Sequence, residues 1–158
     1  DPHSNVSCAL FNNIKVDDGF KYIMSAIGKI NDKDLVMYYP DEGAMKRYSG
    51  MITDKPYAFG IKDRDWRSGD IRGIILMNED VAKGKNVLIV DDICSKGGTF
   101  YYSAKALKAA GANDIYLYIT HCENTIFKGE LINSDLIKHI YTTRSVFTLA
   151  HEKITVLK

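Results

Sequence analysis

The sequence predicts an α/β fold of three layers, with a mainly parallel central sheet flanked by helices and a flexible hairpin protruding from it. Three observations predict this fold. Short apolar runs typical of strands alternate with amphipathic segments typical of helices. The run Val87–Val90 is apolar at all four positions, as in a parallel strand buried on both faces. The chain has 158 residues, of which 46% are apolar, and this suits one domain with a full core.

The first part of the chain predicts a helix, a strand and a second helix. An amphipathic segment follows two acidic residues and carries the apolar stripe Phe20, Ile23, Met24 and Ile27. The apolar run Leu35–Tyr39 predicts a strand that proline 40 ends. Asp41 then stands where a side chain caps a helix, which we place at residues 42–51.

Residues 61–77 predict a long, partly exposed hairpin. The strand that leads into it, residues 57–62, has a period of two that puts Tyr57, Phe59 and Ile61 on one face. Lys62 and Arg64 then share the opposite face. Residues 65–70 are rich in charged and turn-forming residues, and residues 71–77 return as an extended segment.

The second half of the chain predicts a repeating order of strand and helix. The strand Val87–Val90 follows a turn at residues 83–85. A glycine-containing loop comes next, and a helix then runs from Thr99 to a stop at Gly111. The buried face of that helix carries Phe100, Ala104 and Leu107. Further strands are predicted at residues 115–119, near residues 140–143 and near residues 154–157.

Composition limits the possible partners. The net charge is +1, and a protein that wraps nucleic acid usually has a strong basic excess, so we expect no nucleic-acid partner. No apolar run approaches the ~20 residues that cross a bilayer, so we expect no membrane partner. The three cysteines form no CxxC pair, which disfavours zinc. Free thiols indicate a reducing compartment, so we expect the cytoplasm.

The segment at residues 91–99 has the residue types that bind a phosphate group. A polar glycine loop joins a buried strand to a helix, and the first N–H groups of a helix have no internal partner. Gly97 and Gly98 let the backbone approach an anion closely, and Ser95 and Thr99 add hydroxyl donors. An ordinary turn between a strand and a helix is the alternative interpretation.

Two acidic residues, Asp91 and Asp92, narrow the choice of ligand. A phosphate group alone would be repelled there, and the nucleotide-binding loop GxxxxGK[ST] has no such pair. The acids are useful if the ligand also carries sugar hydroxyls, or a Mg²⁺ ion that hydroxyls and carboxylates share. Phosphate at the glycines and a diol at the aspartates together indicate ribose 5-phosphate.

The segment at residues 87–99 resembles the phosphoribosyl pyrophosphate (PRPP)-binding motif of type I phosphoribosyltransferases and of the ribose-phosphate pyrophosphokinase family. Other segments are similar to the second family in order and spacing. Pro40–Arg47 resembles its PDxGxxKR stretch, and Lys62 with Arg64 resembles its K-x-R. Residues 1–4, 120–121 and 141–143 are similar to its D-L-H-A segment, its TH pair and a strand near its end.

The resemblance implies that residues 1–158 form one phosphoribosyltransferase-like domain, the C-terminal half of a longer two-domain protein. It implies the reaction of ribose 5-phosphate with ATP to give PRPP and AMP, with Mg²⁺ as cofactor and a homo-oligomer as the full-length protein. Lys62 and Arg64 would stabilise charge on the transferring phosphates, and His3 and Asp41 would hold Mg²⁺. Asp91 and Asp92 would address the ribose hydroxyls. The 5-phosphate would be bound by Ser95, Lys96, Gly97, Gly98 and Thr99.

This chain departs from the family pattern at two places. Ser95 and Lys96 stand where the family has Asp-Thr, and Pro2 and Val6 replace the usual Leu and Gln of the metal segment. The assigned roles also have simpler alternative interpretations. Lys62 and Arg64 can be a solvated hairpin face, and Asp41 can be only a helix cap.

Two other functions share the loop at residues 91–99. A stand-alone phosphoribosyltransferase would consume PRPP without ATP, and no base-recognition element is evident for it. A regulatory domain would bind PRPP or nucleotides without catalysis. Such domains keep the loop and lose the catalytic lysine, whereas Lys62 is present.

Overall fold

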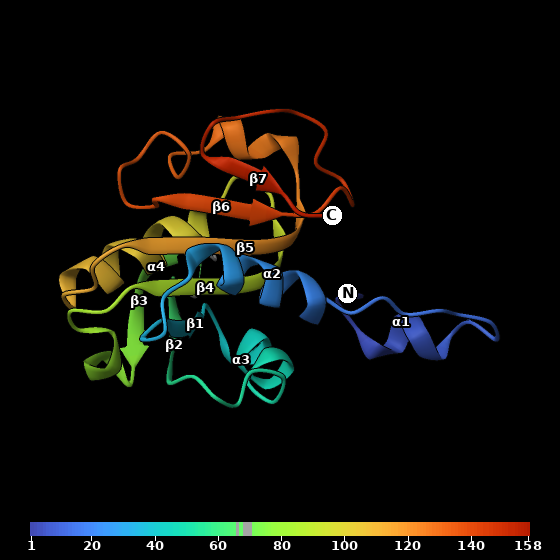
Figure 1. The fold of residues 1–158 in the computed structure, drawn as a ribbon, viewed down its shortest axis with the longest axis horizontal. Coiled ribbons are helices and arrows are strands. Elements are labelled where there is room, and N and C mark those ends of the chain that lie inside the picture. The colour runs from blue at the N-terminus through green and yellow to red at the C-terminus, as the bar shows by residue number, and fades with distance from the viewer. Residues whose placement is uncertain (66, 68–70) are drawn as a thin grey trace.

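The computed structural model describes residues 1–65, 67 and 71–158, apart from the side chains of Asn5, Arg64 and Ile71. It has the predicted α/β fold in three layers (Figure 1). The helices are α1 (Asn5–Ala9), α2 (Phe20–Ile30), α3 (Glu42–Tyr48) and α4 (Gly98–Ala109), with 3-10 turns η1 (Glu79–Ala82) and η2 (Asn124–Lys128). The strands are β1 (Val36–Tyr39), β2 (Tyr57–Arg64), β3 (Ile71–Met77), β4 (Val87–Cys94), β5 (Ile115–Cys122), β6 (His139–Thr142) and β7 (Ile154–Val156).

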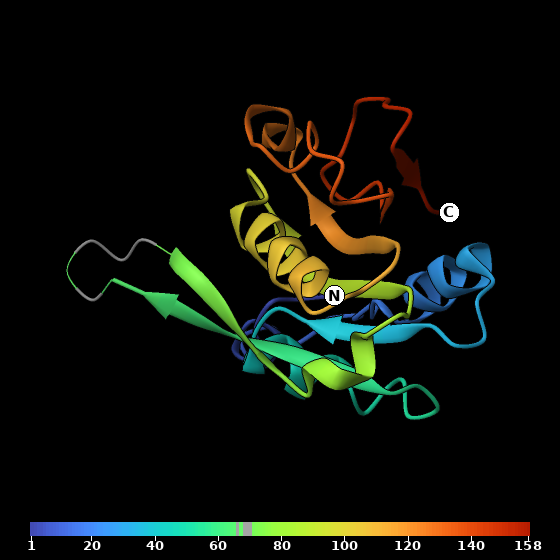
Figure 2. The same ribbon diagram turned by 90° about the vertical axis from the view of Figure 1, so that its left-hand side faces the viewer.

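The seven strands form one sheet in the order β3-β2-β1-β4-β5-β6-β7. Neighbouring strands are parallel except β2 and β3, which pair antiparallel as the predicted hairpin. The adjoining ends of β2 and β3 extend beyond the helices that cover the sheet (Figure 2). Because the other strands run the same way, their carboxyl ends meet at one edge, where open α/β sheets bind ligands.

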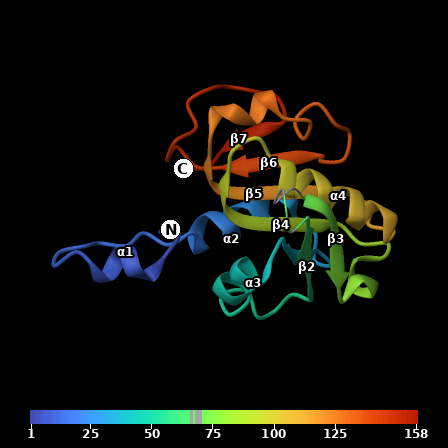
Figure 3. The same cartoon turned by 180° about the vertical axis from the view of Figure 1, so that it is seen from behind.

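Two apolar clusters cover the two faces of the sheet. One face packs against α4, with Phe100, Ala104 and Leu107 buried as the sequence predicts. The other packs against α2 and α3, where Ile23 and Tyr48 are buried (Figure 3). The central strands β1 and β4 are therefore covered on both sides, which explains their uninterrupted apolar runs.

The orientation of α2 differs from the prediction. Phe20 is 39% exposed and Met24 is 42% exposed, so these two residues of the predicted stripe do not face the core. The face that packs on the sheet carries Ile23, Ala26, Ile27 and Ile30 instead. This set also follows helical spacing, and it places the small Ala26 where the helix approaches the sheet. Helix α3 begins at the predicted residue and ends at Tyr48, three residues earlier than predicted.

Strands β4 and β5 extend beyond the predicted ends. The prediction placed Asp91 in a loop, but residues 91–94 continue β4. Backbone pairing with β5 keeps them extended, since Asp91 pairs with Ile119 and Cys94 with Cys122. The loop between β4 and α4 is therefore only residues 95–97. This extension holds both aspartates on a rigid strand rather than in a loop.

Crossing a bilayer takes a long apolar helix, and the described part of the chain contains none of that kind.

Candidate functional site

The predicted site residues come together in one cavity. Its volume is about 550 Å³, within the range usual for small-molecule sites. It lies where the carboxyl ends of β1 and β4 meet the start of α4. All the predicted residues whose side chains the structure describes line it, namely His3, Asp41, Lys62, Asp91, Asp92, Ser95, Lys96, Gly97, Gly98 and Thr99. The side chain of Arg64 lies outside the described residues.

The first turn of α4 forms one wall of the cavity. Gly97 precedes the helix with a φ of 81°, a backbone conformation that favours glycine, and no side chain caps the helix start. The first N–H groups of α4 are therefore left for another acceptor. A Cβ atom at Gly98 would meet no heavy atom within 4 Å, because Gly98 faces the open cavity. This geometry suits an anion such as a phosphate group.

Asp92 and Asp91 have different environments at the end of β4. Asp92 is 5% exposed, and its Oδ2 lies 2.7 Å from both Arg47 Nη1 and His3 Nδ1. Burial raises the pKa of Asp91 to about 7, and the neighbouring charges of Asp92 and Asp41 also raise it, against a hydrogen bond from the Asp92 N–H. One carboxylate of the pair is thus held by Arg47 and His3, while burial raises the pKa of the other to about 7.

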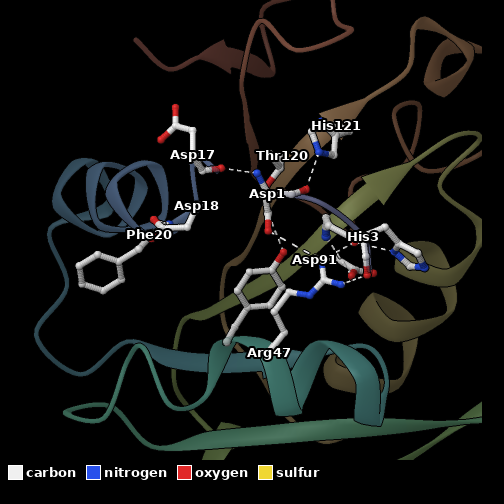
Figure 4. A network of polar contacts seen from close by, with 12 residues as sticks. Asp1, His3, Asp17, Asp18, Phe20, Arg47, Asp91, Thr120 and His121 are labelled. Carbon is white, nitrogen blue, oxygen red and sulfur yellow. Dashed lines mark hydrogen bonds and ion pairs between the residues drawn. The ribbon is translucent and has the colours of Figure 1, made fainter. Parts of the chain in front are cut away.

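Arg47 belongs to the site although the sequence analysis gave it no role. It projects from α3 and contacts Asp92 at 2.7 Å, lies 3.7 Å from Asp1 Oδ1 and also donates to the carbonyl of His3. Figure 4 shows it between Asp1, His3 and the end of β4. Its position in the segment Pro40–Arg47, on a helix that starts at the same sheet edge, was the available signal.

Lys62 points into the cavity from β2. Its Nζ lies 2.7 Å from Asp41 Oδ2, and the Lys62 side chain is 21% exposed. Burial acts to raise the pKa of Asp41, but the hydrogen bonds from Lys62 and from the Ala44 N–H outweigh it and lower that pKa. Asp41 also caps α3 as predicted, since its Oδ1 accepts the Ala44 N–H at 2.9 Å. Lys62 is therefore not a solvated hairpin charge.

The described residues contain no group of three or more His, Cys, Asp or Glu side chains placed to hold a metal ion. His3 and Asp41 line the same cavity, but each already contacts another side chain, Asp92 and Lys62 respectively. Mg²⁺ commonly binds through one or two carboxylates together with substrate phosphates and water. The residues present therefore fit a Mg²⁺ ion that the protein shares with a substrate. The assignment of His3 and Asp41 as its ligands stays a prediction.

Ser95 contacts a residue that the sequence analysis missed. Its Oγ donates to Glu123 Oε2 at 3.0 Å and lies 3.1 Å from Thr125 Oγ1. Glu123 directly follows β5, so it reaches the edge of the sheet next to the end of β4. The pairing of parallel strands was the only sequence signal for this contact, because 28 residues separate the two side chains.

Asp91→Asn should make the stability of the chain less dependent on pH. The pKa of Asp91 is raised to about 7 in the folded chain, so the stability it contributes is complete below about pH 4 and is lost as pH rises through 7. Asparagine cannot ionise and keeps that stability. As the pH rises from 4 to 8, we expect the free energy of unfolding of the variant to increase by about 1–3 kcal/mol relative to that of the unmodified chain. Urea unfolding at both values measures this, and an equal difference at both would contradict it. Asp54→Asn, at an exposed position, is the matched control.

Comparison with known protein families finds one domain match. Residues 51–133 match the model of the phosphoribosyl transferase domain. Among curated proteins, the chain is 31% identical over 152 residues to the ribose-phosphate pyrophosphokinase of Sulfurisphaera tokodaii, covering 92% of this chain and 50% of that protein. It is 30% identical over 156 residues to the ribose-phosphate pyrophosphokinase of Mycoplasma pneumoniae, covering 92% and 46%.

The fold is also similar to solved structures. The phosphoribosylpyrophosphate synthetase from Mycobacterium smegmatis superposes with a TM-score of 0.77 at 22% identity, covering 99% of this chain and 52% of that one. An adenine phosphoribosyltransferase superposes with a TM-score of 0.53 at 14% identity, covering 78% and 76%. The chain spans half or less of the length of the curated relatives that it matches.

Proposed function

This chain belongs to the phosphoribosyl transferase domain family, and from that premise we propose that it supplies the ribose 5-phosphate site of a ribose-phosphate diphosphokinase. The reaction converts ATP and ribose 5-phosphate into AMP and PRPP. One observation carries the proposal: a single cavity joins an uncapped helix start, a pair of aspartates and a lysine on a protruding hairpin. The curated relatives named ribose-phosphate pyrophosphokinase support it.

Ribose 5-phosphate fits the two walls of the cavity. The 5-phosphate would accept hydrogen bonds from the N–H groups at the start of α4 and from Thr99, while Lys96 adds positive charge. The 2- and 3-hydroxyls would face Asp91 and Asp92. Arg47 and His3 hold Asp92 in place, so the diol would meet a carboxylate that is already fixed. Fixed partners lower the entropic cost of binding.

The transfer step needs positioning and charge neutralisation more than covalent help. The anomeric oxygen of ribose 5-phosphate attacks the β-phosphorus of ATP and gives up its proton to solvent. The bond from the β-phosphorus to the oxygen that bridges to the α-phosphorus breaks, and AMP leaves with that oxygen. In the proposed reaction Lys62 leaves Asp41 and donates to the transferring phosphates. Arg64 is assigned the same task from its place in the sequence.

Mg²⁺ is part of the proposal. His3 and Asp41 would hold it together with phosphate oxygens of the substrate, since the described residues do not form a complete protein ligand set. When bound, the ion supplies positive charge that neutralises the phosphate oxygens. Binding would require Asp41 to exchange its contact with Lys62 for one with the ion.

We further propose that the chain is the C-terminal domain of a two-domain protein that works in the cytoplasm as a homo-oligomer. The relatives that it matches along nearly its whole length are about twice as long, which supports a second domain. In this proposal ATP is bound partly by that other domain and by a neighbouring subunit. No partner made of nucleic acid or membrane is proposed.

A stand-alone phosphoribosyltransferase is the second candidate. The family model itself, whose description names phosphoribosyl transfer, favours it. Such an enzyme would release pyrophosphate from PRPP when given an acceptor base, and it would not consume ATP. A purely regulatory PRPP-binding domain ranks lower, because Lys62 is present and lines the cavity.

The test measures binding and turnover separately. We expect calorimetry to show that this chain binds ribose 5-phosphate and PRPP, and binds ribose at least about tenfold more weakly, because ribose lacks the charged group that α4 addresses. We expect AMP release from ATP to be slow or absent with this chain alone. Failure to bind either phosphorylated sugar would reject the proposed site. Full activity of this chain alone would reject the need for a second domain, and pyrophosphate release with a base would favour the second candidate.

A further inference from the structure

The loop between β4 and α4 rests against a segment that follows β5. Glu123 is the first residue of that segment, and its N–H donates to the carbonyl of Cys94 at 2.8 Å. Its Oε2 accepts hydrogen bonds from Ser95 Oγ at 3.0 Å and from Thr125 Oγ1 at 2.7 Å. Glu123 therefore contacts the end of β4 through its backbone and the loop through its side chain.

Close packing limits where this loop can move. A Cβ atom at Gly129 would lie 1.8 Å from the carbonyl oxygen of Lys96, so the two backbones are in direct contact. A Cβ atom at Gly97 would lie 2.8 Å from Leu131 Cδ2. The segment at residues 123–131 thus packs directly against Lys96 and Gly97 of the loop. The loop keeps its position as long as these contacts hold it against the segment.

The hydrogen bond to Glu123 changes the role of Ser95. A serine hydroxyl has one hydrogen to donate, and that of Ser95 stays within the cluster of Ser95, Glu123 and Thr125. Phosphate oxygens are acceptors, so a hydroxyl whose hydrogen is already used is a poor partner for them. Hydrogen bonds from Thr125 and Ser95 lower the pKa of Glu123, so this carboxylate remains charged at neutral pH.

We propose that Glu123 is a positioning residue, which fixes the loop at residues 95–97 by accepting the Ser95 hydroxyl and so holds the start of α4 in place for phosphate. The inference rests on the proposed function only for the identity of that phosphate, the 5-phosphate of ribose. Ser95 then binds the protein rather than the ligand. The acid that the family pattern has at position 95 is absent, and the carboxylate of Glu123, which directly follows the neighbouring strand β5, lies beside that position instead.

The first experiment is a double-mutant cycle on ribose 5-phosphate binding. Glu123→Ala and Ser95→Ala should each raise the dissociation constant about fivefold to tenfold, and the double variant should be no weaker than either single one. Glu123→Gln should restore most of the affinity, because its amide oxygen still accepts a hydroxyl. Glu130→Ala removes an exposed charge from the same segment and should change nothing. Additive losses, or no loss with Glu123→Ala, would overturn the inference.

The second experiment does not depend on the ligand. Amide hydrogen exchange at Tyr101 and at residue 123, whose N–H groups donate to the carbonyls of Gly97 and Cys94, should quicken at least about fivefold in Glu123→Ala. Amides in the middle of β4 and the melting temperature should stay close to those of the Glu130→Ala control. Unchanged exchange at both amides would reject the positioning role even if affinity falls. If the unmodified chain binds no ribose 5-phosphate but exchange changes as expected, the proposed function fails and the positioning role stands.

Discussion

Lys62→Ala should reduce AMP formation by about 100-fold to 1,000-fold and change ribose 5-phosphate binding by less than about threefold. The reason is geometric. Lys62 reaches the cavity from β2 and contacts Asp41, whereas the walls that we assign to the sugar phosphate are α4 and the end of β4. The positive charge of Lys62 then stabilises the charge that develops on the transferring phosphates, and it does not bind ribose 5-phosphate.

The rate of AMP release by Lys62→Ala is measured on a form of the protein that releases AMP. Calorimetry on the same preparation measures the affinity for ribose 5-phosphate. Lys85→Ala is the control, because Lys85 is exposed, pairs with Asp34 at 3.6 Å and precedes β4 at the opposite edge of the sheet. An equal fall in affinity and turnover would mean that Lys62 binds the ground state. No fall in turnover would remove it from the catalytic residues.

Arg47→Met should lower the free energy of unfolding by about 2–4 kcal/mol and weaken ribose 5-phosphate binding by at least about tenfold. Asp92 is 5% exposed, and Arg47 is its 2.7 Å partner. After the guanidinium is removed, His3 at 2.7 Å is the side-chain partner that this buried carboxylate keeps among the described residues. A buried charge without adequate partners is costly, and the carboxylate is also the group that we assign to the ribose hydroxyls.

Denaturant unfolding of three variants tests this account of Arg47. Arg47→Met combined with Asp92→Asn should recover part of the stability that Arg47→Met loses, since no carboxylate is then left unpaired. Ribose 5-phosphate affinity should not recover in the double variant, because the carboxylate itself is gone. A double variant less stable than both single ones would show that Arg47 acts by packing rather than by pairing with Asp92.

Much of the fold could be predicted because periodicity and capping are local properties. The apolar run at residues 87–90, the cap at Asp41 and the glycine stop at Gly111 all stand where the structure has a strand, a helix start and a helix end. The alternation of these elements then required a parallel sheet. The predicted binding loop could be placed at the carboxyl edge for the same reason.

The errors have a common cause. The facing of α2 was wrong at Phe20 and Met24, because two stripes on one helix are apolar and only contact with the sheet selects between them. The end of β4 was predicted too early, because Asp91 and Asp92 do not favour a strand by themselves. Pairing with β5 supplies the hydrogen bonds that keep them extended.

The sequence by itself determined the order of elements, and it predicted a phosphate-binding loop and a pair of acids that narrows the predicted ligand to a sugar phosphate. These follow from residues close together in the chain, where helix starts, turns and strand periods are set by local backbone chemistry. Only the tertiary structure decided which side chains contact the two aspartates and the loop at residues 95–97. Arg47 reaches Asp92 across 45 residues and Glu123 reaches Ser95 across 28, and parallel pairing of β1, β4 and β5 brings them to one edge.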